Sequence, residues 1–352
     1  MSTRRKLPSR WKRFRYRLEG WFLEVLAILV PLLPRRMLVR LTNAAGWLAF
    51  HLLARERRIA LTNLDIAFGQ SKSVEEKRRI ACSAFQTFAR SLLGLFWSRR
   101  FDRTMLDKLV DIDPKCLETL VQQRESGKGV IFVTLHYGEW ELLGLAMALL
   151  GCPLTIVTEQ LRNPHVTRIF ERLRGRAGSR IILQRNAVTK LFKSLKRGEC
   201  VALLIDLNAL PSRGGIWLDF FGKPVFSYSA VAALALHTGA TIAGTVGHPL
   251  PDGRIRIVYG PEIPAVSTGD EETDLQVISQ ACLRYCEELI RQHPENWLWF
   301  YRRWKFRPTA EMAGFPYYSR YIEEARPRYA SDRRAADSNA THTPSAPQHN
   351  GP

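Results

Sequence analysis

The chain is poor in acidic residues relative to basic ones. It carries 33 Asp and Glu against 52 Lys and Arg in 352 residues, which gives a formal net charge of +19. This positive charge predicts attraction to polyanions: membrane surfaces, phosphorylated lipids, acidic proteins or nucleic acid. The length and the hydrophobic content of 46% suit one large globular domain with an N-terminal extension.

Cysteine is also scarce, and the six cysteines form no motif. No two are separated by two residues, and the histidines near them fit no zinc spacing. We therefore predict a reducing compartment, no disulfide framework and no metal site. Cys282 and Cys286 share one face of a predicted helix, where they are expected to pack as small apolar side chains.

Several catalytic and nucleotide-binding signatures are missing. The chain has no Gly-x-Ser-x-Gly elbow, no P-loop and no dinucleotide fingerprint. No cysteine stands beside a histidine in the sequence, and no module typical of nucleic-acid binding is present. These absences argue against a serine nucleophile and a nucleotide cofactor.

The N-terminal region lacks an apolar run long enough to cross a bilayer. The stretch Trp21–Leu33 has thirteen residues, short of the roughly 20 that a spanning helix needs. A basic segment with aromatics, Arg4–Arg17, precedes it, and a second apolar segment, Leu38–Leu53, follows. No small-residue cleavage site follows the first run. We predict an anchor inserted in one leaflet over residues 1–55; a tilted span and a docked soluble hairpin remain alternatives.

A strand pattern runs into a histidine in the middle of the chain. The segment Val130–Leu135 is apolar except for Thr134, which is typical of a strand buried on both faces of a parallel sheet. Leucine-rich sequence follows Gly138 and ends at Gly151, which predicts a helix. His136 is therefore expected in a strand-to-helix turn, where open α/β sheets bind ligands.

Glu141 follows His136 by five residues, too many for one helical face, since such residues lie about 140° apart. The two meet only if His136 lies in the turn and Glu141 in the first helical turn. In that arrangement Glu141 holds one ring nitrogen and leaves the other as a general base. The alternative is a histidine that merely caps the turn.

Apolar runs alternate with amphipathic segments through residues 56–310, which predicts an α/β fold with a mostly parallel central sheet flanked by helices. After about residue 326 the composition predicts a disordered tail within 311–352. The expected strands are 130–135, 154–158, 180–183, 201–205, 241–246 and 255–259, and the expected helices are 73–97, 164–174, 187–196, 228–237 and 272–293.

Short motifs along the chain occur in the order found in one known family. They are Arg58-Ile-Ala-Leu-Thr-Asn63-Leu, His136-Tyr-Gly-Glu139-Trp-Glu141, Asn163-Pro164 with Arg172-Leu-Arg174-x3-Gly178, Leu203-Leu-Ile-Asp206, Phe220-Phe-Gly222-x-Pro224 and Pro294-Glu-x-Trp297-x-Trp299-x2-Arg302-Arg-x-Lys305-x-Arg307-Pro308.

Together these motifs resemble the lipid A late acyltransferases, a branch of the glycerolipid (lysophospholipid) acyltransferase superfamily that also holds phosphatidylinositol mannoside acyltransferases. The resemblance covers roughly residues 18 to 310. Two positions depart from the family pattern. Glu139 stands where the family usually has Asn, and Glu159 stands where the second block usually has Arg.

The resemblance implies an O-acyltransferase in which His136 and Glu141 are catalytic and Arg174 and Asp206 bind substrate. It implies transfer from acyl carrier protein or acyl-CoA to a hydroxyl of a lipid A precursor, without an acyl-enzyme, metal or cofactor, on the cytoplasmic face of the inner membrane. From position alone, Asp206 is equally a turn residue, and Arg174 equally part of a solvated helix face.

Two further expectations and two other functions remain open. The Trp and Arg cluster at 297–307 fits a membrane-interface or phosphate-contacting surface, or one that stacks nucleic-acid bases. Phe220-Phe-Gly fits either a wall of an acyl groove or a hairpin with a core plug. The other functions are acylation of another membrane glycolipid or aminolipid with acyl-CoA, and a non-catalytic basic protein that binds membrane or nucleic acid.

Overall fold

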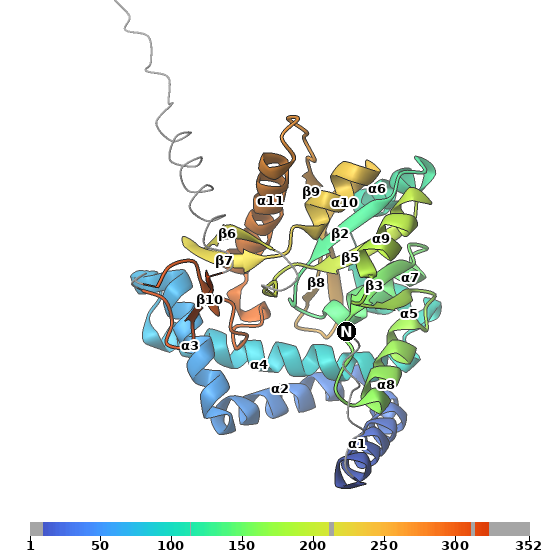
Figure 1. Ribbon diagram of the computed structural model, residues 1–352. Helices are drawn as coiled ribbons and strands as arrows, with labels where there is room; N and C mark the ends of the chain where they lie inside the picture. The colour runs from blue at the N-terminus through green and yellow to red at the C-terminus, as the bar shows by residue number, and fades with distance from the viewer. Residues whose placement is uncertain (1–9, 113, 211–214, 311–313, 324–352) are drawn as a thin grey trace, which may run out of the picture.

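The computed structural model describes residues 10–112, 114–210, 215–310 and 314–323. The tail predicted to be disordered after about residue 326 lies outside these residues. Their main feature is a seven-stranded sheet with strand order β1-β9-β8-β2-β5-β3-β4 (Figure 1). The strands are β1 (Val110–Ile112), β2 (Val130–Thr134), β3 (Leu154–Thr158), β4 (Arg180–Leu183), β5 (Cys200–Leu204), β8 (Thr241–Pro249) and β9 (Ile255–Ile263).

Five neighbouring strands, from β8 to β4, are parallel, while β9 runs antiparallel to β8 and pairs in parallel with β1. The predicted mostly parallel sheet is therefore confirmed. β2 is buried along its whole length, because helices cover both faces of the sheet. The predicted strands and helices match observed elements to within a few residues at each end.

Helices cover the two faces of the sheet as two separate groups. One face packs against α5 (Arg103–Leu109), α7 (Trp140–Leu149), α8 (Pro164–Gly175) and the C-terminal part of α4 (Val74–Trp97). The other packs against α9 (Ala187–Lys196), α10 (Ala230–Thr238) and α11 (Glu271–Gln292). α6 (Pro114–Glu125) precedes β2. Cys282 and Cys286 are buried on the inner face of α11, as predicted.

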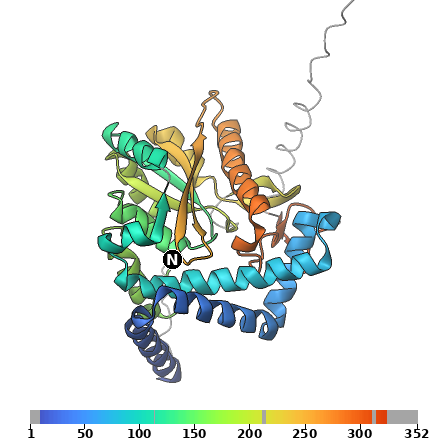
Figure 2. The same ribbon diagram turned by 180° about the vertical axis from the view of Figure 1, so that it is seen from behind.

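The N-terminal helices lie along the base of the domain. α1 (Arg10–Leu29), the short helix η1 (Val30–Leu32), α2 (Arg35–Leu52), α3 (Ala54–Phe68) and η2 (Gly69–Ser71) lead into α4. Both views show α2 and α4 side by side, with α1 reaching past α8 (Figures 1 and 2). Within the described ranges no single helix has the length and hydropathy of a membrane span. α2 and the segment Ala54–Ser71 reach that hydropathy only together, bent by 92°.

The three tryptophans and Arg303 of the C-terminal motif are buried, so the predicted surface of exposed aromatic rings is wrong. Arg302, Lys305 and Arg307 are half-buried. Trp297, Trp299, Trp304 and Arg303 are each at most 1% exposed. The tryptophan rings pack against the hairpin of β6 (Ile216–Phe220) and β7 (Lys223–Ser227), around the buried Phe220. Of the two alternatives for Phe220-Phe-Gly, the structure thus shows the hairpin with a core plug. The other elements here are η3 (Ser98–Arg100), η5 (Pro294–Asn296), β10 (Phe306–Arg307) and β11 (Arg320–Tyr321).

Candidate active site

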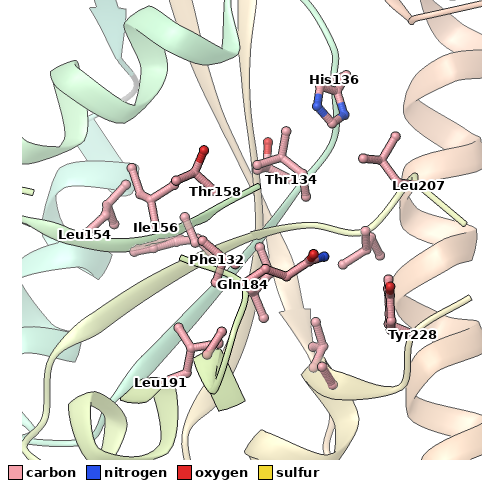
Figure 3. Close-up of a pocket in the computed structure, with 18 of the residues that line it drawn as sticks. Phe132, Thr134, His136, Leu154, Ile156, Thr158, Gln184, Leu191, Leu207 and Tyr228 are labelled. Carbon is pink, nitrogen blue, oxygen red and sulfur yellow. The ribbon is translucent and has the colours of Figure 1, made fainter. Parts of the chain in front are cut away.

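A cavity of about 1200 Å³ opens at the carboxyl ends of the parallel strands. That is the edge at which α/β sheets bind ligands. The cavity reaches both faces of the sheet and its lining is mainly apolar, with His136 on its wall (Figure 3). We call the part under α7 the α7-side arm; it is lined by Phe132, Thr134, Leu143, Gly144, Met147, Leu154, Ile156 and Ala202. The opposite part, the α10-side arm, is lined by Leu191, Leu203, Ile205, Val231, Ala233 and Leu275.

His136 lies in the turn between β2 and α7, as predicted, and its position is fixed from several sides. The turn is closed by backbone hydrogen bonds from the N–H of Gly138 to the carbonyl of Asn296 and from the N–H of Glu139 to the carbonyl of Gly247. Gly138 has φ +56°, and a Cβ there would lie 2.1 Å from the Gly247 carbonyl oxygen. Only glycine fits this point of the motif.

The partner of the His136 ring is Asp206. Nδ1 of His136 lies 2.9 Å from Oδ1 of Asp206, and the backbone N–H of His136 donates to Oδ2 of the same carboxylate at 3.0 Å. The indole N–H of Trp297 donates to Oδ2 at 2.9 Å. Asp206 is 1% exposed and follows β5, the strand beside β2. Parallel pairing thus brings the two residues together at one sheet edge.

The surroundings of Asp206 keep it ionised. Burial favours the neutral acid, but the charge of His136 and the hydrogen bonds from His136 and Trp297 outweigh burial and hold the pKa of Asp206 below its ordinary value. A carboxylate only accepts hydrogen bonds, so Nδ1 of His136 carries a proton. In the neutral form of the ring, Nε2 is then the nitrogen that can accept a proton.

Glu141 does not contact the His136 ring, so the expected histidine–glutamate hydrogen bond is wrong. Its Oε1 and Oε2 accept from Nη2 and Nε of Arg174 at 2.5 and 2.8 Å. Glu141 is 7% exposed at the start of α7, facing α8. The non-helical turn between His136 and α7 leaves Glu141 directed to this neighbour, while Asp206 occupies the position beside the ring.

Arg174 lies at the end of α8 with its guanidinium on the cavity wall. Besides the two bonds to Glu141, Nη1 donates to Thr158 Oγ1 at 3.1 Å. Burial alone would lower the pKa of Arg174, but attraction to Glu141 raises it above its ordinary value. Arg174 is therefore a fixed, charged donor beside the cavity, and the solvated helix face is excluded.

Glu139, one of the two departures from the family pattern, is fully buried on the other side of the turn. Both of its oxygens lie 2.5 Å from Nη2 of Arg35, at the start of α2. Arg35 also donates to the carbonyl of Gly253 and lies over the Trp97 ring. Arg90 is close enough for its charge to interact with Glu139. This ion pair ties the N-terminal helices to the catalytic turn.

Sequence reasoning placed His136, Asp206 and Arg174 at the site but missed two of their partners. Thr158 ends β3, and Trp297 belongs to the C-terminal motif that we expected to be exposed. The position of Thr158 at the end of a predicted strand was a usable signal. Nothing local indicated that Trp297 contacts Asp206, because the contact joins residues 91 positions apart.

A protein family and several known proteins match most of this chain. The model of the family described as bacterial lipid A biosynthesis acyltransferase matches residues 7–306. The lipid A biosynthesis palmitoleoyltransferase of Escherichia coli K12 is 27% identical over 306 residues, covering 85% of this chain and 94% of that protein. The lipid A biosynthesis lauroyltransferase of the same organism is 25% identical over 289 residues, with coverages of 80% and 89%.

A phosphatidylinositol mannoside acyltransferase of Mycobacterium tuberculosis is 24% identical over 230 residues, covering 64% of this chain and 70% of that protein. The family match spans both the turn that carries His136 and the strand end that carries Asp206. This chain belongs to the bacterial lipid A biosynthesis acyltransferase family and is an acyltransferase.

Proposed function

We propose that this enzyme transfers a fatty acyl chain from an acyl thioester to a hydroxyl of a lipid A precursor, with His136 as the general base and Asp206 as its orienting partner. One observation carries the proposal: a histidine with Nδ1 bonded to a buried carboxylate lies on the wall of a large apolar cavity. The cavity suits an alkyl chain, and an imidazole whose Nδ1 is held by a carboxylate suits proton removal from a hydroxyl at Nε2.

The reaction needs no acyl-enzyme. Nε2 of His136 takes the proton of the acceptor hydroxyl as its oxygen attacks the thioester carbonyl carbon. A C–O bond forms, the C–S bond breaks, and the proton passes from His136 to the leaving thiolate. Asp206 stabilises the imidazolium that forms between these steps and holds the ring in one orientation.

Arg174 and Glu141 form the second part of the proposed site. The oxygen of the thioester carbonyl gains negative charge as the hydroxyl attacks, and a fixed cation beside the cavity stabilises that charge. Glu141 uses both oxygens to hold the Arg174 guanidinium. In this proposal Glu141 acts through Arg174, as a positioning residue, and not through His136.

The donor is a thioester of acyl carrier protein or coenzyme A. The carrier protein that we propose as donor is acidic, and the net charge of +19 on this chain favours its approach. Raising the ionic strength is then expected to slow transfer from the carrier protein more than transfer from coenzyme A, because salt screens attraction between exposed charges. Equal salt profiles for the two donors contradict a protein carrier.

The N-terminal helices are proposed to hold the enzyme on the cytoplasmic face of the inner membrane. They carry most of the exposed large apolar side chains of the described residues, intermixed with arginines, as in helices that lie in a bilayer interface. These side chains are Trp11, Phe14, Leu18, Trp21, Phe22, Ile28, Leu29, Leu32, Met37, Leu41, Trp47, Leu48, Leu52 and Leu53.

The acyl-transfer proposal is tested with purified enzyme in detergent. Three lipids are tested as acceptors: a lipid A precursor, mannosylated phosphatidylinositol and an aminolipid. Each is incubated with acylated acyl carrier protein and, separately, with acyl-CoA, and the products are identified by mass spectrometry. We expect one added acyl chain on the lipid A precursor. If a chain is added only to another lipid, the proposed acceptor is wrong. If the thioester is consumed in none of the incubations, the result supports a non-catalytic protein.

Membrane attachment is tested by sedimentation with vesicles that contain anionic lipids, at high salt. The substitutions Trp21→Glu and Trp47→Glu together are expected to release the protein, because they place charge within the exposed apolar surface. The matched control is Val277→Glu, an exposed apolar residue of α11, far along the chain from that surface. Equal sedimentation of both variants contradicts the proposed attachment.

A further inference from the structure

The outward side of α9 carries only positive charges. Four small or apolar residues of the helix are buried against the sheet at helical spacing: Ala187, Leu191, Ser194 and Leu195. The residues that face solvent include four cations, one of them just before the helix: Arg185, Lys190, Lys193 and Lys196. We call these four residues the α9 basic face. No acidic residue occurs within Ala187–Lys196.

The positive charge of this face is not balanced by nearby carboxylates. Among the residues that the structure describes, none of the four cations forms an ion pair, whereas Arg197, directly after the helix, pairs with Glu199 at 2.7 Å. The sequence from residue 172 to 198 contains nine basic and no acidic residues. The helix α11, on the same face of the sheet, has five acidic and two basic residues. The α9 basic face is therefore a local concentration of positive charge.

The α9 basic face borders the opening of the cavity. Val188 lines the cavity and is 58% exposed, so it lies on the rim, where the cavity meets solvent. Lys190 follows it by two residues, about 3 Å along the helix axis. Arg185 directly follows Gln184, another residue of the cavity wall. Phe192, 36% exposed, adds a second apolar side chain to the outward side. Positive charge and apolar contact thus meet beside the opening.

The rest of the rim has a different charge. Glu271 and Glu272, at the start of α11, line the same cavity and are exposed. Between α9 and α11 lies α10, which contacts both and has no Lys, Arg, Asp or Glu. The loop after β3 adds the exposed Glu159 to the rim, with the exposed Arg162 three residues later. An acidic partner is attracted to the α9 side and repelled from the α11 side, which fixes its orientation.

The α9 basic face also lies apart from the helices that we propose to bind the membrane. α1 docks on the start of α8, where the side-chain amide of Asn163 donates to the carbonyl of Tyr16 and to Glu19, both at 2.9 Å. α8 covers one face of the sheet, and α9 covers the other. Figure 1 shows α9 above α1 and α2. A soluble partner can therefore reach α9 while α1 and α2 lie on a bilayer.

We infer that the α9 basic face is the docking surface of an acidic protein carrier, which passes its acyl thioester over Val188 into the α10-side arm. The cations continue from the rim to Lys196, eight residues and about 12 Å beyond Val188 along the axis. A protein surface spans this distance, whereas a donor held by the cavity alone makes no contact so far from the rim. This inference rests on the proposed function, because it names the donor of the same reaction.

The test compares two donors with the same acyl chain, an acyl carrier protein loaded with dodecanoate and dodecanoyl-CoA. The substitutions Lys190→Glu and Lys193→Glu together reverse two charges of the face, and neither residue lines the cavity. We expect kcat/KM with the carrier protein to fall about tenfold or more, because exposed charges at an interface mainly set the association rate. With dodecanoyl-CoA we expect kcat/KM to stay within about twofold of wild type, as is usual for surface substitutions.

The matched control is Arg103→Glu with Lys108→Glu on α5. Both residues are exposed, lie on the other face of the sheet and do not line the cavity. This control changes the net charge by the same amount as the α9 variant, and its kcat/KM with the carrier protein is expected to stay close to wild type. Salt gives a second measurement. It is expected to slow transfer from the carrier protein in the control, but not in the α9 variant, where attraction has been replaced by repulsion.

Three outcomes overturn the inference. One is an unchanged kcat/KM with the carrier protein in the α9 variant. Another is an equal loss with both donors, or an equal loss in the α5 control, since neither is specific to carrier docking. The third is loss of sedimentation with anionic vesicles while use of the carrier protein is unchanged, which assigns the face to the membrane.

Direct binding separates this inference from the proposed function. The acylated carrier protein is immobilised, and binding of the full-length enzyme in detergent is measured by biolayer interferometry. If the carrier binds the wild type but not the α9 variant, and no lipid A precursor gains a chain, the docking surface stands and the acceptor assignment fails. If a lipid A precursor is acylated from dodecanoyl-CoA while the carrier is neither bound nor used, the function stands and the docking surface fails.

Discussion

Two glutamates at the start of α7 are both buried and paired with an arginine, but their side chains point in opposite directions. Glu139 and Glu141 are two positions apart, each bonds to an arginine, and both are at most 7% exposed. Glu139 faces away from the cavity towards Arg35 of α2, and Glu141 faces Arg174 on the cavity wall. The same chemical pair thus joins the turn to the N-terminal helices on one side and completes the candidate site on the other.

This difference teaches that burial and pairing do not by themselves mark a catalytic carboxylate. The direction of each side chain decides, and it follows from the geometry of α7: Glu139 stands at the residue before the helix, and Glu141 lies in its first turn. Changes on the cavity side are expected to alter turnover, and changes on the outer side are expected to alter stability.

The largest expected effect is on the cavity side. His136→Ala is expected to lower single-turnover acyl transfer by about 10²–10⁴, the usual contribution of a positioned general base. Asp206→Asn is expected to fall in the same range. If the amide oxygen keeps the bonds from the His136 N–H and Trp297, the amide NH2 faces Nδ1 and moves the ring proton to Nε2. The two changes together are expected to be little worse than His136→Ala alone, since the residues act as a unit. Wild-type turnover by His136→Ala would contradict the mechanism.

The outer carboxylate is expected to matter for stability. Glu139→Ala leaves the Arg35 guanidinium buried without its counter-charge, which typically costs about 3–5 kcal/mol in the free energy of unfolding. The measurement is urea unfolding of the detergent-solubilised enzyme.

A paired replacement separates the ion pair from the space that it fills. Arg35→Met with Glu139→Leu removes both charges and is expected to restore most of the stability lost in Glu139→Ala. Its single-turnover rate is expected to stay within a few fold of wild type, because neither residue lines the cavity. A large loss of rate in a stable double variant would show that the ion pair also positions the catalytic turn.

A smaller effect is expected at Arg174. Arg174→Lys keeps the charge but loses the two-pronged contact with Glu141, and Glu141→Gln weakens the same contact from the other side. Each is expected to lower turnover by about 10²-fold, the range for one lost donor to a developing oxyanion. If Glu141→Gln is fully active while Arg174→Lys is not, Glu141 has no positioning role.

The smallest effect is a pH dependence of stability at Asp206. Its pKa is depressed in the folded state, so the stability that it contributes is present above the unfolded value of about 4. That contribution is lost as the pH falls through the lowered folded value. The difference in unfolding free energy between wild type and Asp206→Asn is therefore expected to shrink as the pH falls below about 4. A difference that stays constant in that acid range would contradict the assignment.

The sequence by itself determined the fold class and three members of the site. Continuous apolar runs such as Val130–Val133 identify strands buried on both faces, and the glycines around α7 bound that helix. Since parallel strands end at one edge, residues directly after β2 and β5 must be neighbours. His136 and Asp206 are such residues, and both are predictable for that reason.

Which partner each side chain takes was decided by the tertiary structure alone. Spacing along the chain allowed Glu141 to reach His136, but the rotation of α7 directs Glu141 to Arg174 and leaves the imidazole to Asp206. The burial of Trp297 and the Arg35–Glu139 pair likewise join residues that are far apart in sequence. Local pattern encodes which face of an element is apolar, but long-range packing sets the direction and the partner of each polar side chain.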